Sequence, residues 1–255
     1  MFEEIKEIIL KAGEIFKEGY FGNKQIELKG KKDLVTEYDI KVEDFLKKAL
    51  SKYGYNFIAE ESVFSIKLNN SIIIDPIDGT TNYTHQIPHC AISVAVYENK
   101  KPKYAYVYNP ILNEFFYAIK GEGAYLNDSK IEVSNNDFFQ RALIATGFPY
   151  SSAENEEDLQ LVIKTLKHIL PKCQDIRRLG SAALDLCYVA CGRFEGFYEI
   201  NLKPWDVAAG MLIVQEAGGI VTNSGNFEYD LFYDKCIVAS NGLIHEEFIE
   251  NLNKK

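Results

Sequence analysis

Two aspartates and a proline follow a strongly apolar run in the first half of the sequence. The run Ser71–Ile74 leads directly into "DPIDGTTNY", in which Asp75 and Asp78 flank Pro76. Because proline fixes φ and lacks a backbone N–H, we expect Asp75–Asp78 to form a stiff turn that ends a strand. Two carboxylates a few ångströms apart repel by roughly 4 kcal/mol at an effective dielectric constant of about 20, unless they are solvated or share a cation. Oxygen ligands select a hard ion, so the pair predicts a Mg²⁺ or Mn²⁺ site.

The residues directly after these aspartates suit an anion instead. Gly79 lets the backbone approach a ligand closely, and a helix that begins at Thr80 would present free N–H groups to it. A cation site and an anion site at one turn indicate a metal-bridged phosphate. The alternative is a plain solvated turn, which an Asp-Pro-x-Asp-Gly string often forms.

Further acidic positions could belong to the same site, and each also has a structural explanation. Glu60 and Glu61 follow the apolar pair Phe57–Ile58, so at least one carboxylate lies at the end of a buried segment. Asp206 lies just inside a helix start, where an aspartate also stabilises the helix dipole. Asp39 ends "TEYD", a capping-box pattern that stabilises a helix by about 1 kcal/mol. The residues alone leave both explanations open.

Composition narrows the class of protein. The chain has 255 residues and a formal net charge of −9, and its 47% hydrophobic and 25% charged residues are ordinary for soluble globular proteins. Since no long Lys/Arg block is present, nucleic acid is not expected as the substrate. The five cysteines form no CxxC pair, which fits a reducing cytosol. We see neither a signal peptide nor an apolar run of membrane-spanning length, so we expect a cytoplasmic protein that does not bind membranes.

The first half of the chain is predicted to combine two amphipathic helices with a sheet. Apolar residues recur at i, i+3 and i+4 over residues 5–16 and again over residues 36–53. Strand-like runs follow, separated by turn-prone segments, and favour an antiparallel meander. These runs are residues 71–75, 91–97, 103–108, 114–119 and 124–127.

The second half alternates strands and helices. Strands are predicted over residues 141–147, 196–200 and 236–240, and helices over residues 157–170, 181–192, 204–219 and 243–255. The alternation favours an α/β half joined to an α+β half. The polar stretch "VSNNDFF" places the boundary near residue 135. Residues 1–135 would then form an N-terminal half with most of the metal ligands, and residues 136–255 a C-terminal half with Asp206 and residues that bind substrate.

Five segments together resemble one protein family. In chain order they are "KGKKDLVTEYD", "FIAEES", "IIIDPIDGTTNY", "RRLGSAALDLCYVACGRFEGFYEI" and "KPWDVAAG". Across nearly the whole chain they are similar to the inositol monophosphatase family of Mg²⁺-dependent phosphatases. The sequence departs from that family at Ala59, where a glycine usually precedes the paired glutamates. The resemblance implies an α+β fold, a layered α-β-α-β-α sandwich of the inositol monophosphatase/fructose-1,6-bisphosphatase type, with the active site between the two halves.

The resemblance also implies two or three Mg²⁺ ions in each active site, with Mn²⁺ as a possible substitute. Glu60, Asp75 and the backbone carbonyl of Ile77 would hold the first ion. Asp75, Asp78 and Asp206 would hold the second, and Glu60 with water molecules would hold a weaker third. Such ions lower the pKa of bound water and stabilise both the entering and the leaving oxygen of a phosphoryl transfer.

Other residues would act on the attacking water or support the metal ligands. By resemblance, Thr80 would bind the first ion and, together with Asp39, orient and deprotonate the water. Adjacent residues rarely both face one ion, so Glu61 would support Glu60 rather than bind metal itself. His85 and His89 have the spacing of a metal pair on a helix, but Pro88 intervenes and we expect no ligand role.

The resemblance points to a polyol phosphate as the substrate. The positions that would bind it are Asp78, Gly79, Thr80, Gly180, Ser181, Ala182 and Glu199. A carboxylate such as Glu199 suits hydroxyl groups and repels a second phosphate, which favours myo-inositol 1-phosphate. Fructose 1,6-bisphosphate, alone or as a second substrate, is the alternative.

A different class of function is also open, because some bacterial relatives contact the transcription or translation machinery. The chain would then be a non-catalytic regulatory or binding protein on the same fold. A chain freed from catalysis should lose Thr80, Asp39 or Asp206, and all three are present. The resemblance further implies a homodimer and inhibition by lithium.

Overall fold

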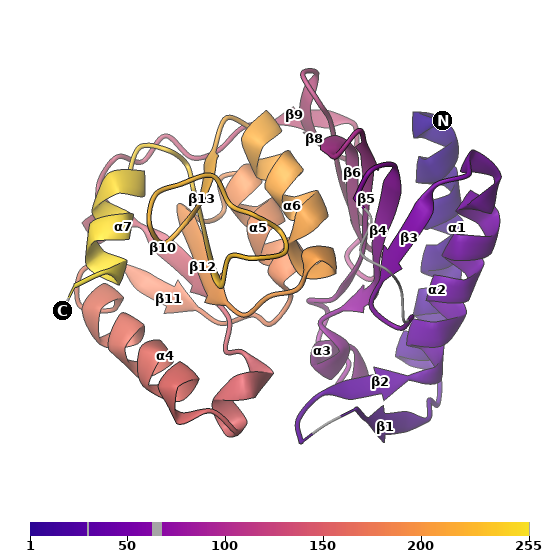
Figure 1. Ribbon diagram of the computed structural model, residues 1–255, viewed down its shortest axis with the longest axis horizontal. Coiled ribbons are helices and arrows are strands. Elements are labelled where there is room, and N and C mark those ends of the chain that lie inside the picture. The colour runs from indigo at the N-terminus through magenta and orange to yellow at the C-terminus, as the bar shows by residue number, and fades with distance from the viewer. Residues whose placement is uncertain (30, 63–67, 255) are drawn as a thin grey trace.

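Helices and sheets alternate in five layers through the molecule (Figure 1). The computed structural model describes residues 1–29, 31–62 and 68–254. From one side to the other, the helical layers are α1 (Phe2–Phe21) with α2 (Glu37–Leu50), α5 (Ala182–Ala190) with α6 (Pro204–Glu216), and α4 (Glu156–Ile169) with α7 (His245–Leu252). A sheet separates each helical layer from the next, which confirms the predicted α-β-α-β-α sandwich. None of the described helices combines the length and the apolar character needed to cross a bilayer.

The first sheet contains the predicted meander. Its seven strands follow the order β3-β4-β5-β6-β7-β8-β9. They are β3 (Asn56–Ala59), β4 (Ser71–Asp78), β5 (Ala91–Glu98), β6 (Lys101–Asn109), β7 (Glu114–Ile119), β8 (Gly123–Leu126) and β9 (Ser129–Ile131). All pairs from β4 to β9 are antiparallel, and only β3 joins its neighbour in parallel. The edge strands β3 and β9 were not predicted as strands.

The second sheet is mixed. Its five strands follow the order β11-β10-β12-β14-β13. They are β10 (Leu143–Thr146), β11 (Asp175–Arg177), β12 (Gly196–Ile200), β13 (Ile220–Asn223) and β14 (Cys236–Ser240). β10 pairs in parallel with β11 and β12, whereas β14 is antiparallel to β12 and β13. The expected α/β half is therefore only partly parallel.

The outer helices near the N-terminus form because each has one apolar face. α1 and α2 bury that face, including Ile9, Phe16 and Leu46, against β4 to β6. α2 starts at the predicted capping box on Thr36 and gives way to a 3₁₀ turn after Leu50. A short antiparallel hairpin, β1 (Ile26–Leu28) with β2 (Leu34–Thr36), precedes α2 and was not predicted.

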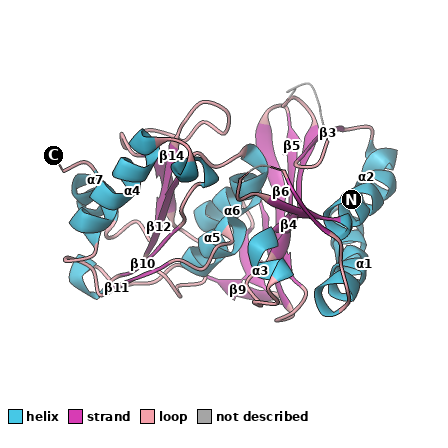
Figure 2. Ribbon diagram, turned by 90° about the horizontal axis from the view of Figure 1, so that it is seen from below, coloured by secondary structure: helices cyan, strands magenta, loops and turns pink. Residues whose placement is uncertain are grey.

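The middle helical layer is apolar on nearly every side because sheets cover both of its faces (Figure 2). Eight consecutive residues of α6, 207–214, are buried, and α5 is buried over almost its whole length. A helix without a polar face belongs in an interior. Since this layer packs on both sheets in one hydrophobic core, the division into residues 1–135 and 136–255 remains an interpretation. The last predicted helix, 243–255, is α7, and Lys255 and Gly30 lie outside the described residues.

Candidate active site

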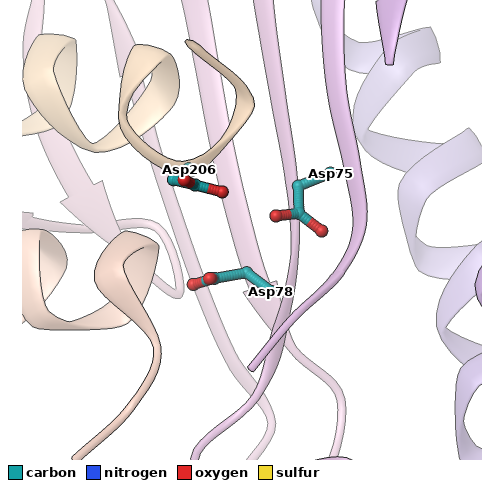
Figure 3. A group of neighbouring side chains, drawn as sticks. All are labelled: Asp75, Asp78 and Asp206. Atoms are coloured by element: carbon teal, nitrogen blue, oxygen red, sulfur yellow. The ribbon is translucent and has the colours of Figure 1, made fainter. Parts of the chain in front are cut away.

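The two aspartates of the "DPIDGTTNY" motif lie on β4 at an irregularity in its pairing. Asp75 is opposite Ser93 of β5 and Asp78 is opposite Ala91, so three steps along β4 match two steps along β5. This arrangement is a β-bulge. Residues three apart on a regular strand point to opposite faces, and the extra residue removes that alternation. The bulge therefore lets both carboxyl groups reach the same side, next to Asp206 (Figure 3).

The prediction of a turn at Asp75–Asp78 was wrong, since β4 continues to Asp78. A bulge is one of the few places in a sheet where the missing donor of a proline is tolerated, so Pro76 does not end the strand. The Asp75 carboxylate stabilises the bulge, because its Oδ1 accepts the Ile77 N–H at 3.0 Å.

Asp206 joins these aspartates from the first turn of α6. One carboxylate oxygen from each of Asp75, Asp78 and Asp206 lies within 4.8 Å of the others (Figure 3). Asp206 also accepts the Lys203 N–H at 2.7 Å through Oδ2. The two explanations of Asp206 therefore hold together: one oxygen caps the helix while the residue belongs to the cluster.

The electrostatics of the cluster are those of crowded, poorly solvated carboxyl groups. Burial raises the pKa of Asp75 well above its usual range, and the Glu60, Asp78 and Asp206 carboxylates add to this effect. Burial and Asp78 likewise raise the pKa of Asp206 well above its usual range. Burial raises the pKa of Asp78 to about 6, opposed by hydrogen bonds from Ser181 and Ala183. A cation among these oxygens would favour the charged carboxylates and so oppose both the burial and the mutual repulsion that raise the pKa values.

Glu60 and Glu61 follow the end of β3, and both pair with Lys29, which directly follows β1. Lys29 Nζ lies 3.2 Å from Glu60 Oε1 and also bonds Glu61. The Glu60 and Asp75 carboxyl groups also shift each other's pKa, so Glu60 connects the cluster electrostatically to Lys29. Burial alone would lower the pKa of Lys29, but the two glutamates outweigh this effect and raise the pKa above its usual value. The ammonium group therefore stays charged. Sequence reasoning did not identify Lys29, because its neighbours in space come from strands that were not predicted.

Asp39 combines the capping role with a place in the site. Its Oδ2 accepts the Thr36 backbone N–H at 2.8 Å and the Thr36 hydroxyl at 2.6 Å, which completes the capping box. Thr80 Oγ1 lies 3.3 Å from Asp39 Oδ1 and 3.0 Å from the Ile77 carbonyl oxygen. The single Thr80 hydroxyl proton can serve only one of these two acceptors at a time. Burial raises the pKa of Asp39 to about 6.

The C-terminal half holds Asp78 through the start of α5. Asp78 Oδ2 accepts hydrogen bonds from the Ser181 hydroxyl and, at 2.8 Å, from the Ala183 N–H. Ser181 and Ala182 are both buried. This contact across the sandwich fixes the orientation of one cluster carboxylate. It joins positions more than a hundred residues apart, and no local sequence signal indicates it.

Gly79 and Gly180 are required by the backbone where the two halves meet. Gly79 has φ +87°, and a Cβ there would lie 3.0 Å from the carbonyl oxygens of both Gly180 and His89. Gly180 has φ +91°, and its Cβ would lie 2.6 Å from Arg178 Nη1. Helix α3 (Thr80–Thr84) starts directly after Gly79, as expected from the sequence.

Glu199 lies on β12, and its carboxylate covers Gly147. A Cβ on Gly147 would come within 1.9 Å of Glu199 Oε2, so only glycine leaves room for that carboxylate. Burial raises the pKa of Glu199 well above its usual range, with further contributions from Asp185 and Asp206. Glu199 therefore belongs to the electrostatic environment of the aspartate cluster. Gly147 was missed because nothing in the local pattern marks it as a neighbour of β12.

The histidine pair has no part in the cluster. His89 Nε2 lies 3.1 Å from Asp185 Oδ1, and both residues are buried. Asn82 donates from Nδ2 to the carbonyl oxygens of His89 and Leu179, each at 2.7 Å, and so ties the two halves together. The position of His89 is thus accounted for by contacts between the halves.

The donor set of the cluster fits a hard divalent cation. Within residues 1–29, 31–62 and 68–254, Asp75, Asp78 and Asp206 are the one set of three or more His, Cys, Asp or Glu side chains that could hold a single ion. All three donors are carboxylate oxygens, which suit Mg²⁺, Mn²⁺ or Ca²⁺ better than Zn²⁺. Burial and the neighbouring carboxylates raise the pKa of Asp75 and of Asp206, so a bound cation would stabilise the charged form of both.

Known proteins resemble the chain over its whole length. Residues 1–255 match the inositol monophosphatase family. Inositol monophosphatase 3 of Solanum lycopersicum is 40% identical over 254 residues, which cover 96% of this chain and 93% of the relative. The extragenic suppressor protein suhB of Bartonella henselae has a similar structure, with a TM-score of 0.92 at 38% identity over 99% of this chain and 98% of that one. The IMPase of Thermotoga maritima gives a TM-score of 0.88 at 36% identity, over 97% and 94% of the two chains.

Proposed function

The chain belongs to the inositol monophosphatase family, and from this premise we propose that it is a Mg²⁺-dependent phosphomonoesterase that hydrolyses myo-inositol 1-phosphate to myo-inositol and phosphate. The observation that carries the proposal is the group of three aspartates, two from β4 and one from the start of α6. A structural role alone would not place three carboxylates within 4.8 Å of one another.

The proposed metal ligands follow from the family resemblance and are compatible with the geometry. Glu60, Asp75 and the Ile77 carbonyl would hold one Mg²⁺. Asp75, Asp78 and Asp206 would hold a second, and Glu60 would contribute to a third. When bound, these ions lower the pKa of water and neutralise charge on the transferred phosphoryl group. Glu61 does not bind metal in this scheme, since its carboxylate pairs with Lys29.

Thr80 and Asp39 are proposed to move the proton of the attacking water. The hydrogen bond from Thr80 Oγ1 to Asp39 Oδ1 lets the hydroxyl pass its own proton to the carboxylate while it accepts one from water. The Thr36 N–H and hydroxyl fix the other oxygen of Asp39 and so hold the acceptor in place. With a pKa of about 6, Asp39 is mostly ionised at neutral pH and can accept a proton.

The substrate is proposed to lie across the two halves. Backbone N–H groups of Gly79 and Thr80, at the start of α3, would bind the phosphate. The polyol contacts Asp78, the segment 180–182 and Glu199. The oxygens of Glu199 suit hydroxyl groups, and in its ionised form this carboxylate would repel a second phosphate, so inositol monophosphate is preferred to fructose 1,6-bisphosphate. We further propose that the protein acts in the cytoplasm as a homodimer.

Phosphate release from a panel of inositol, sugar and nucleotide phosphates, with and without Mg²⁺, tests this function. We expect the highest kcat/KM on inositol 1-phosphate, complete loss of activity after chelation, and recovery with Mg²⁺. Full activity in excess EDTA, with metal verifiably removed, would rule out the mechanism. A higher kcat/KM on fructose 1,6-bisphosphate would replace the substrate but keep the chemistry.

A further inference from the structure

A buried carboxylate on α2 contacts the turn that carries Glu60. The Glu43 residue is 3% exposed and lies one helical turn after Asp39. Its Oε2 accepts the Glu61 backbone N–H at 2.8 Å, and its Oε1 accepts the Ser62 hydroxyl. Lys47 completes the group, with Nζ 3.5 Å from Glu43 Oε1 and 2.7 Å from Ser62 Oγ.

These contacts fix the backbone on the far side of Glu60. β3 ends at Ala59, and the Glu60 N–H still bonds the Ile74 carbonyl oxygen of β4 at 3.3 Å. The next residue leaves the β4 ladder: the Glu61 N–H bonds Glu43 instead, and the Ser62 N–H turns back to the Ala59 carbonyl oxygen at 3.5 Å. The main chain at Glu60 is thus held by β4 on one side and by α2 on the other.

Simple packing of α2 against a turn does not call for a buried charge, because an apolar or amide side chain would avoid the desolvation penalty. A carboxylate with two acceptor oxygens is suited to two donors at once, and here both donors belong to the residues directly after Glu60. The same face of α2 presents Asp39 to Thr80. One helix therefore sets the position of two parts of the site.

We propose that Glu43 is a positioning residue for the metal ligand Glu60. This inference rests on the proposed function in one respect, since it takes Glu60 to be a ligand. Glu43 acts through the backbone of residues 60–62 and does not itself touch metal or substrate. Groups that orient metal ligands typically change metal affinity or activity by about 10–100-fold when they are removed.

The substitution Glu43→Gln tests the proposal with little change in shape. In the present structure each oxygen of Glu43 accepts one of these donors, and glutamine replaces one of the two oxygens with an NH₂ donor, so one of the two acceptor positions is lost. We expect the affinity for Mn²⁺ alone, measured by calorimetric titration of the folded protein, to fall about tenfold. The Mg²⁺ concentration for half-maximal hydrolysis of an aryl phosphate should rise by a similar factor. The substrate KM at saturating Mg²⁺ should stay within about twofold of wild type.

Glu216 provides a matched control away from the site. Its carboxylate accepts the Gly121 and Gly123 N–H groups at 3.0 and 3.1 Å and lies 3.1 Å from Lys120 Nζ, with the side chain 9% exposed. Since both N–H groups bond Oε2 and Lys120 pairs with Oε1, Glu216→Gln makes the same chemical change at a contact between a helix and a turn and removes the charge pair with Lys120. We expect it to lower the melting temperature without changing the Mn²⁺ affinity or the Mg²⁺ requirement.

Two results would overturn the proposal: wild-type Mn²⁺ affinity in Glu43→Gln, or an equal loss of affinity in Glu216→Gln. If Glu43→Gln does not fold, Ser62→Ala removes one of the two donors and should weaken Mn²⁺ binding about threefold, and an unchanged affinity there would refute the inference. Failure of the proposed function is separate, because it shows as metal-independent turnover by the wild-type protein. The calorimetric comparison does not depend on turnover.

Discussion

The substitution Asp206→Asn should raise the stability of the metal-free protein and strongly lower its activity in Mg²⁺. The carboxylate oxygens of Asp206, Asp75 and Asp78 lie within 4.8 Å of one another. Two full charges at that distance repel by about 3.5 kcal/mol at an effective dielectric constant of about 20. Asp206 is partly exposed, so screening reduces this value, and we expect a gain of about 1–2 kcal/mol. The amide oxygen of asparagine can still accept the Lys203 N–H, so the helix cap is kept.

The sign of this stability change follows from the raised pKa of Asp206. A carboxyl group whose pKa rises on folding stabilises the folded state below its unfolded pKa of about 3.9, and this contribution is lost as the pH rises through the folded pKa. At neutral pH the charge on Asp206 therefore destabilises the folded state, and its removal should stabilise it. For a chain of 255 residues, the gain corresponds to a rise in melting temperature of about 4 °C in EDTA.

Thermal unfolding in EDTA and in Mg²⁺, combined with steady-state kinetics, tests both parts. Wild type should melt at a higher temperature in Mg²⁺ than in EDTA, and Asp206→Asn should lose most of that difference. Its kcat in Mg²⁺ should fall at least about a hundredfold. Asp44→Asn, on the exposed face of α2, controls for the change in net charge. A variant that is destabilised in EDTA but active per folded molecule would show that Asp206 serves the helix and not the metal.

Two further predictions concern the substrate side and the C-terminal half. Glu199→Gln should lower kcat/KM for inositol 1-phosphate several-fold to about tenfold, hardly affect hydrolysis of an aryl phosphate and ease entry of a bisphosphate. Gly147→Ala displaces the same carboxylate and should have the same effects. Equal losses on all three substrates would contradict the assignment of Glu199 to the substrate. The Nε2 and Nδ1 atoms of His245 lie 2.9 and 2.8 Å from the hydroxyls of Thr222 and Ser240, and burial lowers the pKa of this imidazole. The neutral imidazole therefore stabilises the fold above the unfolded pKa of about 6.5, and this contribution is lost as the pH falls. The difference in melting temperature between wild type and His245→Gln should therefore shrink from about pH 7.5 to about pH 5.5, and a constant difference would show that the imidazole does not titrate in this range.

Local patterns predicted the long elements because their signals are contained within each element. The periodicity of α1 and α2, the apolar run of β4 and the proline at the start of α6 are all read from neighbouring residues. The strands that were missed are short: β1, β2, β9 and β11 have three residues each, and β3 and β13 have four. Such strands are stabilised by their pairing partners, which the local sequence does not reveal.

The acidic residues were found from the sequence, but their geometry was not. Asp75 and Asp78 were expected in a turn, because Pro76 is a turn signal in isolation. The pairing of β4 with β5 converts that signal into a bulge, and β5 begins more than ten residues later in the chain. The contacts of Ser181 and Ala183 with Asp78 are likewise invisible without the packing of α5 between the sheets.

A common arrangement explains how the cluster can exist before a metal arrives. Each aspartate of the site accepts a backbone N–H with one carboxylate oxygen. The pairs are Asp39 with Thr36 at 2.8 Å, Asp75 with Ile77 at 3.0 Å, Asp78 with Ala183 at 2.8 Å and Asp206 with Lys203 at 2.7 Å. Such bonds favour the charged carboxylate and fix its orientation, which offsets part of the repulsion. We therefore expect the metal-free protein to stay folded, with the ligands held in place by the starts of α2, α5 and α6 and by the β4 bulge rather than by the ion.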